Sequence, residues 1–234
     1  MDTKPHDALV ILKLYELRGE ALMRAARAWF FTEFNPQSGK EIVGLLQSGE
    51  KQSAYYRMVA SHWEVAAALV NNGGIVGKSG VRVDEMSAER IQRVMAINVT
   101  GSILCAREAV KRMSTRRGGK GGVIVNLSSV ASKLGAPNTY VDYAASKGAI
   151  DSFTIGLGYE VAGEGIRVAA IRPGLIDTEI HASGGEPDRA HRLAHMVPMK
   201  RVGTAEEIAN AIVWLMSDDA SYVTSAILDV SGGR

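Results

Sequence analysis

The sequence predicts a doubly wound α/β fold, in which helices flank a parallel β-sheet, built as a single domain over residues 1–234. Two observations predict it. Short apolar runs rich in Val and Ile alternate with longer segments in which apolar residues recur at helical spacing. Asparagine or serine follows two of these runs, at the strand ends where open α/β sheets bind ligands.

The composition excludes several classes of protein. The 234 residues suffice for one α/β domain, and 46% hydrophobic and 22% charged residues are ordinary for a globular chain. A net charge of +2 gives no reason to expect nucleic acid or an anionic membrane as a partner. The densest basic run, Lys111 to Lys120, is interleaved with Gly and Ser, which is typical of a solvated loop.

The expected location is the cytoplasm. Cys105 is the single cysteine, so an internal disulfide is impossible and a reducing compartment is permitted. No run of 18 apolar residues predicts a membrane span, and the N-terminus lacks the order of charges, apolar core and cleavage site of a signal peptide.

The first part of the chain predicts strands at residues 8–12, 29–31 and 53–59, with helices between them. Residues 63–70 are ambiguous between helix and strand. Seventy residues are few for three such units, at roughly 30 residues per βαβ unit. We therefore expect a deletion near Ala66–Leu69 and loose packing there.

The second part gives clearer signals. Apolar periodicity predicts helices over residues 87–97 and 103–113, and places Ile91, Val94, Met95 and Ile97 on the inner face of the first. Thr204-Ala-Glu-Glu207 is a capping box that opens a further helix. The remaining expected elements are strands at 123–127, 167–171 and 227–230, and a helix at 143–161.

A candidate active site surrounds the strand at 123–127. Ser129 lies just beyond its end, and alternation along the strand points Ser128 the other way, which makes Ser128 the weaker candidate. Tyr143 and Lys147 are four residues apart on one helix face. A nearby ammonium favours the phenolate and lowers a tyrosine pKa, so that the phenol exchanges protons near neutral pH.

Each of these features alone is common, because Tyr and Lys at this spacing occur on many helices. Together with Asn98 they resemble the short-chain dehydrogenase/reductase family, whose active site combines a Ser, a Tyr-x-x-x-Lys and an upstream Asn. The resemblance implies a Rossmann-like fold with strand order 3-2-1-4-5-6-7. It also implies hydride transfer between a nicotinamide and a small carbonyl or alcohol substrate, with four catalytic residues. These are Tyr143 as acid/base, Lys147 holding the ribose, Ser129 orienting the substrate oxygen, and Asn98 maintaining a water relay.

Two further motifs carry the resemblance and imply cofactor contacts. Residues 71–74, Asn-Asn-Gly-Gly, resemble the Asn-Asn-Ala-Gly of the family, and residues 173–178 resemble its Pro-Gly-x-x-x-Thr. Read without the family, both are turn signals. The residues implied to bind cofactor here, besides Tyr143 and Lys147, are Asn72, Gly74, Pro173, Gly174, Ile176 and Thr178.

The first βα turn departs from the family. Members carry a glycine-rich turn whose bare amides hold the cofactor pyrophosphate. In this chain the corresponding residues, 13–20, contain a single glycine, Gly19. Glu33, after the expected second strand, is either a surface glutamate or the acidic residue that binds the adenosine ribose and favours NAD over NADP. The expected cofactor is therefore NAD or NADP, with NAD favoured.

Residues 179–201 read as an irregular, substrate-covering loop. His191 and His195 have metal-ligand spacing, but no third ligand lies nearby, and His181 stands apart, so no metal is expected.

The resemblance also implies a homodimer or homotetramer paired through the helix at 143–161, which we expect to expose Ile150, Phe153 and Leu157. A hypothesis of another class stays open. Because the phosphate-binding turn is missing from residues 1–70 while 71–234 keep the catalytic motifs, the chain could be a non-catalytic oligomeric scaffold.

Overall fold

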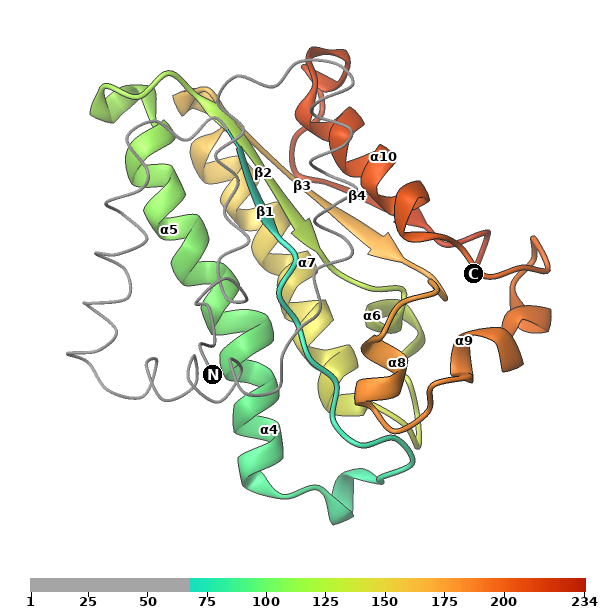
Figure 1. The fold of residues 1–234 in the computed structure, drawn as a ribbon. Coiled ribbons are helices and arrows are strands. Elements are labelled where there is room, and N and C mark those ends of the chain that lie inside the picture. The colour runs from blue at the N-terminus through green and yellow to red at the C-terminus, as the bar shows by residue number, and fades with distance from the viewer. Residues whose placement is uncertain (1–67) are drawn as a thin grey trace, which may run out of the picture.

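The computed structural model describes residues 68–234, and Figure 1 draws the rest as a thin trace. The three strands expected before residue 60, the Gly19 turn and Glu33 lie outside the described residues.

Four parallel strands form the sheet of the described part. They are β1 (Ala68–Asn71), β2 (Gly122–Leu127), β3 (Ile166–Pro173) and β4 (Ala226–Val230). Their spatial order is β1-β2-β3-β4 (Figure 1). The register pairs Asn71 with Asn126 and Leu127 with Ile171, so the strands end at one common edge. This is the order expected for the last four strands.

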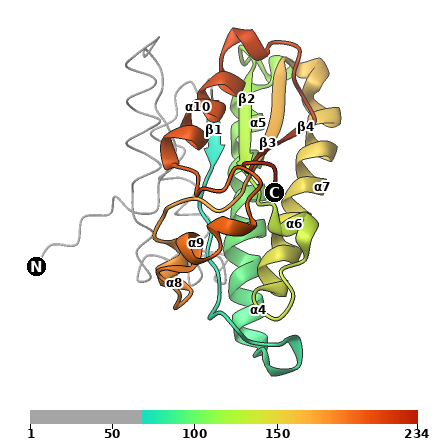
Figure 2. The ribbon, with the colours of Figure 1, turned by 90° about the vertical axis from the view of Figure 1, so that its right-hand side faces the viewer.

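Helices cover both faces of this sheet (Figure 2). On one face lie α4 (Ala88–Met95), α5 (Ser102–Met113) and α7 (Val141–Val161), and on the other lies α10 (Ala205–Met216). Shorter helices are α6 (Ala131–Leu134), α8 (Ile180–Ser183) and α9 (Arg189–Arg192). A π-helical turn, Ala96–Gly101, joins α4 to α5. Single 3-10 turns occupy Val83–Glu85, Thr115–Arg117, Ala162–Glu164, Ala194–Met196 and Asp218–Ala220.

The core has two halves, one on each face of the sheet. Leu69, Ile124 and Val168 pack with α5 and α7. Their neighbours in sequence, such as Val70 and Val125, pack with α10 on the opposite face. Successive strand residues point to opposite faces, and both faces are buried, which explains why the strands read as continuous apolar runs.

Three packing expectations were wrong. Loose packing was expected around Ala66–Leu69; Ala66 and Ala67 lie outside the described residues, but Leu69 is 1% exposed in β1. Ile91, expected inside, is exposed on α4, while Val94 and Ile97 are buried as expected. In α7, Ile150 was expected to be exposed and is buried, and Phe153 and Leu157 pack against the core.

The α7 error has a physical cause. Small and apolar residues occur on every side of this helix, so its sequence does not define a single buried face. The apolar side chains that α7 does expose are Ile155 and Tyr159.

The segment at residues 179–201 is more regular than expected, because α8, α9 and the 3-10 turn at Ala194–Met196 lie within it. The capping box of α10 is confirmed. The Glu207 amide donates to Thr204 Oγ1 at 3.3 Å, and the Thr204 amide donates to Glu207 Oε2 at 2.8 Å.

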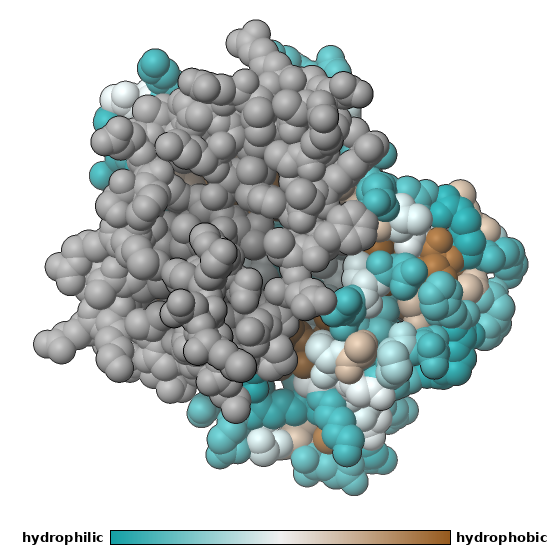
Figure 3. Space-filling model, in the orientation of Figure 1, coloured by the Kyte–Doolittle hydropathy of each residue, from teal (hydrophilic) through white to brown (hydrophobic). Residues whose placement is uncertain are grey.

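The surface of the described residues is mainly hydrophilic where Figure 3 shows it, with apolar side chains scattered among polar ones. No helix within residues 68–234 is both long and apolar enough to cross a membrane.

Candidate active site

The structure brings Ser129, Tyr143 and Lys147 together beyond the carboxyl end of β2. Lys147 Nζ lies 5.6 Å from the centroid of the Tyr143 ring. The Ser129 side chain hydrogen-bonds to the Tyr143 hydroxyl, and Ser129 Oγ also accepts from the Ala131 amide at 3.1 Å. The three side chains predicted from spacing therefore share one site.

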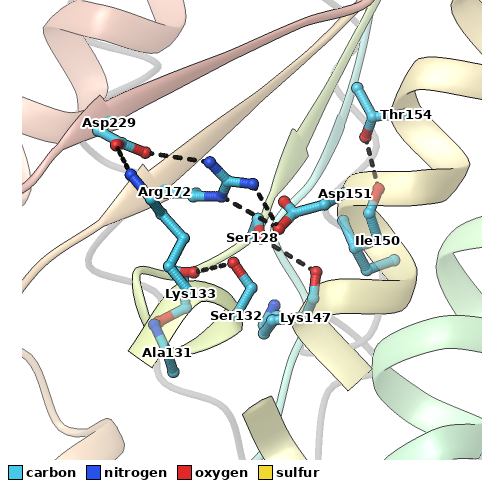
Figure 4. A network of polar contacts seen from close by, with 11 residues as sticks. Ser128, Ala131, Ser132, Lys133, Lys147, Ile150, Asp151, Thr154, Arg172 and Asp229 are labelled. Atoms are coloured by element: carbon cyan, nitrogen blue, oxygen red, sulfur yellow. Dashed lines mark hydrogen bonds and ion pairs between the residues drawn. The ribbon is translucent and has the colours of Figure 1, made fainter. Parts of the chain in front are cut away.

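Ser128 has a different role, as alternation along the strand predicts. Its side chain is buried, and Ser128 Oγ donates to the Lys147 carbonyl at 3.2 Å (Figure 4). This bond ties the end of β2 to the helix turn that carries Lys147, so Ser128 fixes the site without facing Tyr143.

Burial sets the pKa values of the pair. Burial raises the pKa of Tyr143 to about 12, against smaller opposite effects of the Ser129 hydrogen bond and the Arg189 charge. Burial also lowers the pKa of Lys147 to about 8, although Asp151 acts in the other direction. The direction for Tyr143 is opposite to the one expected from a lysine neighbour, because desolvation of the phenolate outweighs the favourable charges. At neutral pH the phenol is protonated.

The Lys147 ammonium is held by the main chain. Lys147 Nζ donates to the Leu127 carbonyl at 2.6 Å, at the last residue of β2. The spacing of Tyr143 and Lys147 in sequence gives no signal for this acceptor. An ammonium has three donors, and the Leu127 carbonyl is the one hydrogen-bond acceptor of Lys147 Nζ within residues 68–234.

Asn98 lies in the π-helical turn between α4 and α5 and is fully buried. Asn98 Oδ1 accepts from the Ile75 amide at 2.8 Å, and Nδ2 donates to the Ile75 carbonyl at 3.0 Å and to Ser146 Oγ at 3.0 Å. The side chain thereby fixes the segment after β1 against the residue preceding Lys147. Sequence reasoning missed Ser146, although its place beside Lys147 marks it as a neighbour of the site.

A second buried polar chain aligns β1, β2 and α7. Asn71 Nδ2 donates to Asn126 Oδ1 at 2.8 Å, and Asn126 Nδ2 donates to Thr154 Oγ1 at 2.9 Å. Buried amides are stable only when bonded in this way. The chain fixes where the strands end relative to α7.

Gly74 lies directly beside the lysine. A Cβ built at this residue would lie 3.4 Å from Lys147 Nζ and 3.6 Å from Asn98 Oδ1. The backbone at Gly74 therefore meets the Lys147 ammonium with no side chain between them. Asn72, half-buried, precedes it at the end of β1. These residues fit the ribose and nicotinamide side of a dinucleotide.

The turn after β3 lies at the same edge. The Pro173 carbonyl accepts from the Val130 amide at 3.1 Å, next to Ser129. Gly174 packs on Ser231, where a Cβ would meet backbone atoms at 2.8 Å, so only glycine fits. Ile176 is buried and pairs with Gly203, and Thr178 is half-buried with a side chain that has no hydrogen bond within residues 68–234.

A network of charged side chains joins the elements around the site (Figure 4). Arg172 donates to Asp151 Oδ2 through Nε at 3.0 Å and Nη2 at 2.9 Å, and pairs with Asp229 at 3.4 Å. Lys133 bonds the other oxygen of Asp229 at 2.7 Å. Through Asp151, one helical turn beyond Lys147, this network links α6, α7, β3 and β4.

The histidines of the loop bind protein groups. His181 Nε2 lies 3.1 Å from the Ile176 carbonyl, His191 pairs with Asp177 at 3.5 Å, and His195 Nδ1 lies 3.0 Å from the Arg192 carbonyl. No group of three His, Cys, Asp or Glu side chains in the described part of the chain has the arrangement of a metal site.

Comparison with known proteins identifies the family. The model of a family described as enoyl-(acyl carrier protein) reductase matches residues 46–234. A second model, of a domain of unknown function, matches residues 5–75. Over 181 residues the chain is 59% identical to the uncharacterized oxidoreductase YgfF of Escherichia coli K12, covering 77% of this chain and 73% of that protein.

Solved structures agree. The chain is similar to a 3-oxoacyl-[acyl-carrier protein] reductase of Brucella melitensis with bound NAD (TM-score 0.67, 36% identity, 75% of this chain and 64% of that one). It is also similar to a protein of Agrobacterium tumefaciens described as a 2-deoxy-D-gluconate 3-dehydrogenase, with bound NADP (TM-score 0.65, 32% identity, 72% and 67%). The chain thus spans just under two thirds of the first of these.

These matches define a nicotinamide-dependent oxidoreductase class with a Rossmann-like sheet. The chain belongs to the short-chain dehydrogenase/reductase family.

Proposed function

We propose that this protein is an NAD(P)-dependent oxidoreductase that interconverts a small carbonyl compound and the corresponding alcohol. The observation that carries the proposal is the meeting of Ser129, Tyr143 and Lys147 at the carboxyl edge of the sheet, where open α/β sheets bind ligands, with the backbone of Gly74 beside Lys147. The proposal treats residues 1–234 as one domain and the active form as a homodimer or homotetramer.

Each side chain has a defined task in this proposal. Ser129 Oγ orients the substrate oxygen. Tyr143 gives its hydroxyl proton to that oxygen during carbonyl reduction and takes it back during alcohol oxidation. Lys147 binds the ribose hydroxyls with the donors that Leu127 leaves free, and its positive charge favours the phenolate as it forms. Asn98 holds Ile75 and Ser146 and so positions Lys147; its proposed water relay adds a proton path.

The proposed cofactor contacts are Asn72, Gly74, Pro173, Gly174, Ile176 and Thr178, with Glu33 on the adenosine ribose. Bound NAD or NADP supplies or accepts the hydride, so that carbonyl, NAD(P)H and one proton give alcohol and NAD(P)⁺. NAD is favoured, since Glu33 would repel the extra phosphate of NADP.

The first prediction concerns Tyr143. In an assay of NAD(P)H oxidation with a panel of ketones and aldehydes, Tyr143→Phe is expected to lose turnover by at least about a thousandfold, because the proton donor is gone. Binding of NAD(P)H should change less than about threefold. Tyr159→Phe, an exposed site on the same helix, is the matched control and should keep wild-type turnover. Turnover retained by Tyr143→Phe would remove the tyrosine from its role.

The second candidate is a binding or scaffold protein without catalysis. Two observations favour it: residues 13–20 lack the glycine-rich turn, and residues 5–75 match a separate family model. Losing several charged hydrogen bonds to a pyrophosphate, at roughly 1.5–3 kcal/mol each, weakens cofactor binding by orders of magnitude. Direct titration of cofactor separates the two candidates.

A further inference from the structure

Arg189 packs on Tyr140, the aromatic neighbour of the proposed acid/base, and lies on helix α9, which the catalytic scheme does not use. Its guanidinium carbon lies 5.3 Å from the centroid of the Tyr140 ring. The Tyr140 ring in turn meets the Tyr143 ring edge to face, with centroids 6.4 Å apart and planes at 72°. One aromatic ring thus separates the Arg189 cation from Tyr143.

Tyr140 is a fixed platform for this cation. It is 5% exposed, and its hydroxyl has no hydrogen-bond partner within residues 68–234. A Cβ on Gly184, just after α8, would lie 2.5 Å from that hydroxyl, so the loop backbone closes directly over the ring. Cation–π contact with a buried ring favours one position of the guanidinium.

The Arg189 charge is only loosely compensated. Glu186 is its carboxylate partner among the described residues, at 4.0 Å, which is beyond hydrogen-bond distance. Glu186 already accepts hydrogen bonds from Arg192 and from Ser79. The Arg189 side chain is 17% exposed, so its donors are reachable yet sit in a medium where an ion pair is stronger than in water.

The charge of Arg189 affects other titratable groups. Burial and, in second place, the charge of Arg189 lower the pKa of Arg234. The charge of Arg189 also acts on Tyr143. The Arg189 guanidinium, with its carboxylate partner among the described residues at 4.0 Å, is a place where an anion is stabilised.

We propose that Arg189 binds a carboxylate carried by the substrate, so that the protein acts on short oxo acids and the corresponding hydroxy acids. The planar guanidinium offers paired donors that match a carboxylate. The proposal requires the substrate carboxylate on Arg189 and its carbonyl beside Tyr143 and Ser129, with the Tyr140 ring between the two groups. This assignment rests on the function proposed above and makes Arg189 its specificity-determining residue.

A matched substrate pair tests it. The wild type, Arg189→Leu, Arg189→Lys and the control Lys200→Gln are assayed with 4-oxopentanoate and with its methyl ester, using NADH and NADPH. Lys200 is a cation of the same loop whose ammonium binds the His195 carbonyl. Arg189→Leu is expected to lose tenfold to a hundredfold in kcat/KM for the acid, mainly through KM, and less than about threefold for the ester.

The variants sharpen the outcome. Arg189→Lys should keep part of the preference for the acid, because lysine keeps the positive charge but lacks the paired donors of the guanidinium group. Lys200→Gln should resemble the wild type with both compounds. Equal losses on acid and ester in Arg189→Leu, or a wild type that does not prefer the acid, would overturn the assignment.

A binding measurement separates this inference from the proposed reaction. Saturation-transfer NMR on 4-oxopentanoate, without cofactor, should show contact with the wild type and Lys200→Gln and none with Arg189→Leu. If no cofactor binds and nothing is turned over, the proposed reaction fails, yet an Arg189-dependent signal still establishes the anion site. A wild type that gives no signal, or a signal that survives in Arg189→Leu, refutes the site even where the reaction is real.

Discussion

At the scale of single residues, burial of the candidate pair Tyr143 and Lys147 opposes the charged form of each side chain. Tyr143 and Lys147 lie close enough to interact, yet the interior disfavours both of their charged forms, and the pKa values of about 12 and about 8 reflect this. Protonated phenol and ammonium coexist below pH 8. That state is ready to donate a proton, which suits carbonyl reduction.

The Lys147 pKa makes stability depend on pH. The value is about 8 in the folded protein and 10.5 in the unfolded chain. Between these values the unfolded chain binds a proton that the folded protein lacks, so the free energy of unfolding rises with pH. Relative to Lys147→Met, the wild type should gain about 3 kcal/mol over this interval, from 1.36 kcal/mol per pKa unit.

Urea unfolding at a series of pH values measures this difference. Lys147→Met removes the titrating group with little change of side-chain volume, so all other titrations are common to both proteins. Parallel pH dependences in the wild type and the variant would show that Lys147 is not desolvated as the structure indicates.

The sequence predicts which residues meet at the site but not their energetics. Spacing four apart places Tyr143 and Lys147 on one face, and alternation separates Ser129 from Ser128. The pKa of Tyr143 depends on burial and on Arg189, which comes from a loop far along the chain. No local pattern contains that information, and for the same reason Arg189 itself was not found from the sequence.

At the scale of elements, α7 connects the whole described structure. It packs on β2, β3 and β4 and carries both Tyr143 and Lys147. The sequence predicts a helix over 143–161, close to the observed Val141–Val161, but it does not predict the buried face, because apolar and small residues occur on every side. Ile150, Phe153 and Leu157 were expected to be exposed for this reason. The capping box of α10 and the strands at 123–127, 167–171 and 227–230 were predicted correctly, whereas the sequence leaves residues 63–70 ambiguous between helix and strand.

Two glycines of α7 test this packing. Gly158 packs on Ser225, whose Cα and amide N would lie 3.0 Å from an added Cβ, while Gly156 has open space around it. Gly158→Ala is expected to destabilise the protein by about 1–3 kcal/mol through overpacking. Gly156→Ala should stabilise it by roughly 0.5–1 kcal/mol, because alanine is the better helix former.

Denaturant unfolding of the two variants beside the wild type gives both values. The same helix and the same substitution two residues apart make each variant the control of the other. Similar effects of the two changes would mean that α7 does not approach Ser225 as described.

At the scale of the whole molecule, the candidate site residues of the described part lie at one edge of the sheet, where the parallel strands end. Gly74, Ser129 and Gly174 follow the ends of β1, β2 and β3, and α7 carries Tyr143 and Lys147, the proposed acid/base and its neighbour. The topology follows from the family resemblance and the order of the motifs. In the proposed complex the pyrophosphate of the cofactor would lie against residues 1–67, where the sequence departs from the family and which are outside the described residues.

The central claim is that a nicotinamide dinucleotide binds at this edge despite the missing glycine-rich turn. The most direct test is calorimetric titration of NADH and NADPH into the full chain. Gly74→Val is the variant that adds a side chain against Lys147, and Gly73→Ala is the control, since a Cβ at Gly73 meets nothing within 4 Å. We expect the wild type and Gly73→Ala to bind NADH or NADPH saturably below millimolar concentration, and Gly74→Val to lose this binding. A wild type that binds neither cofactor at millimolar concentration would contradict it.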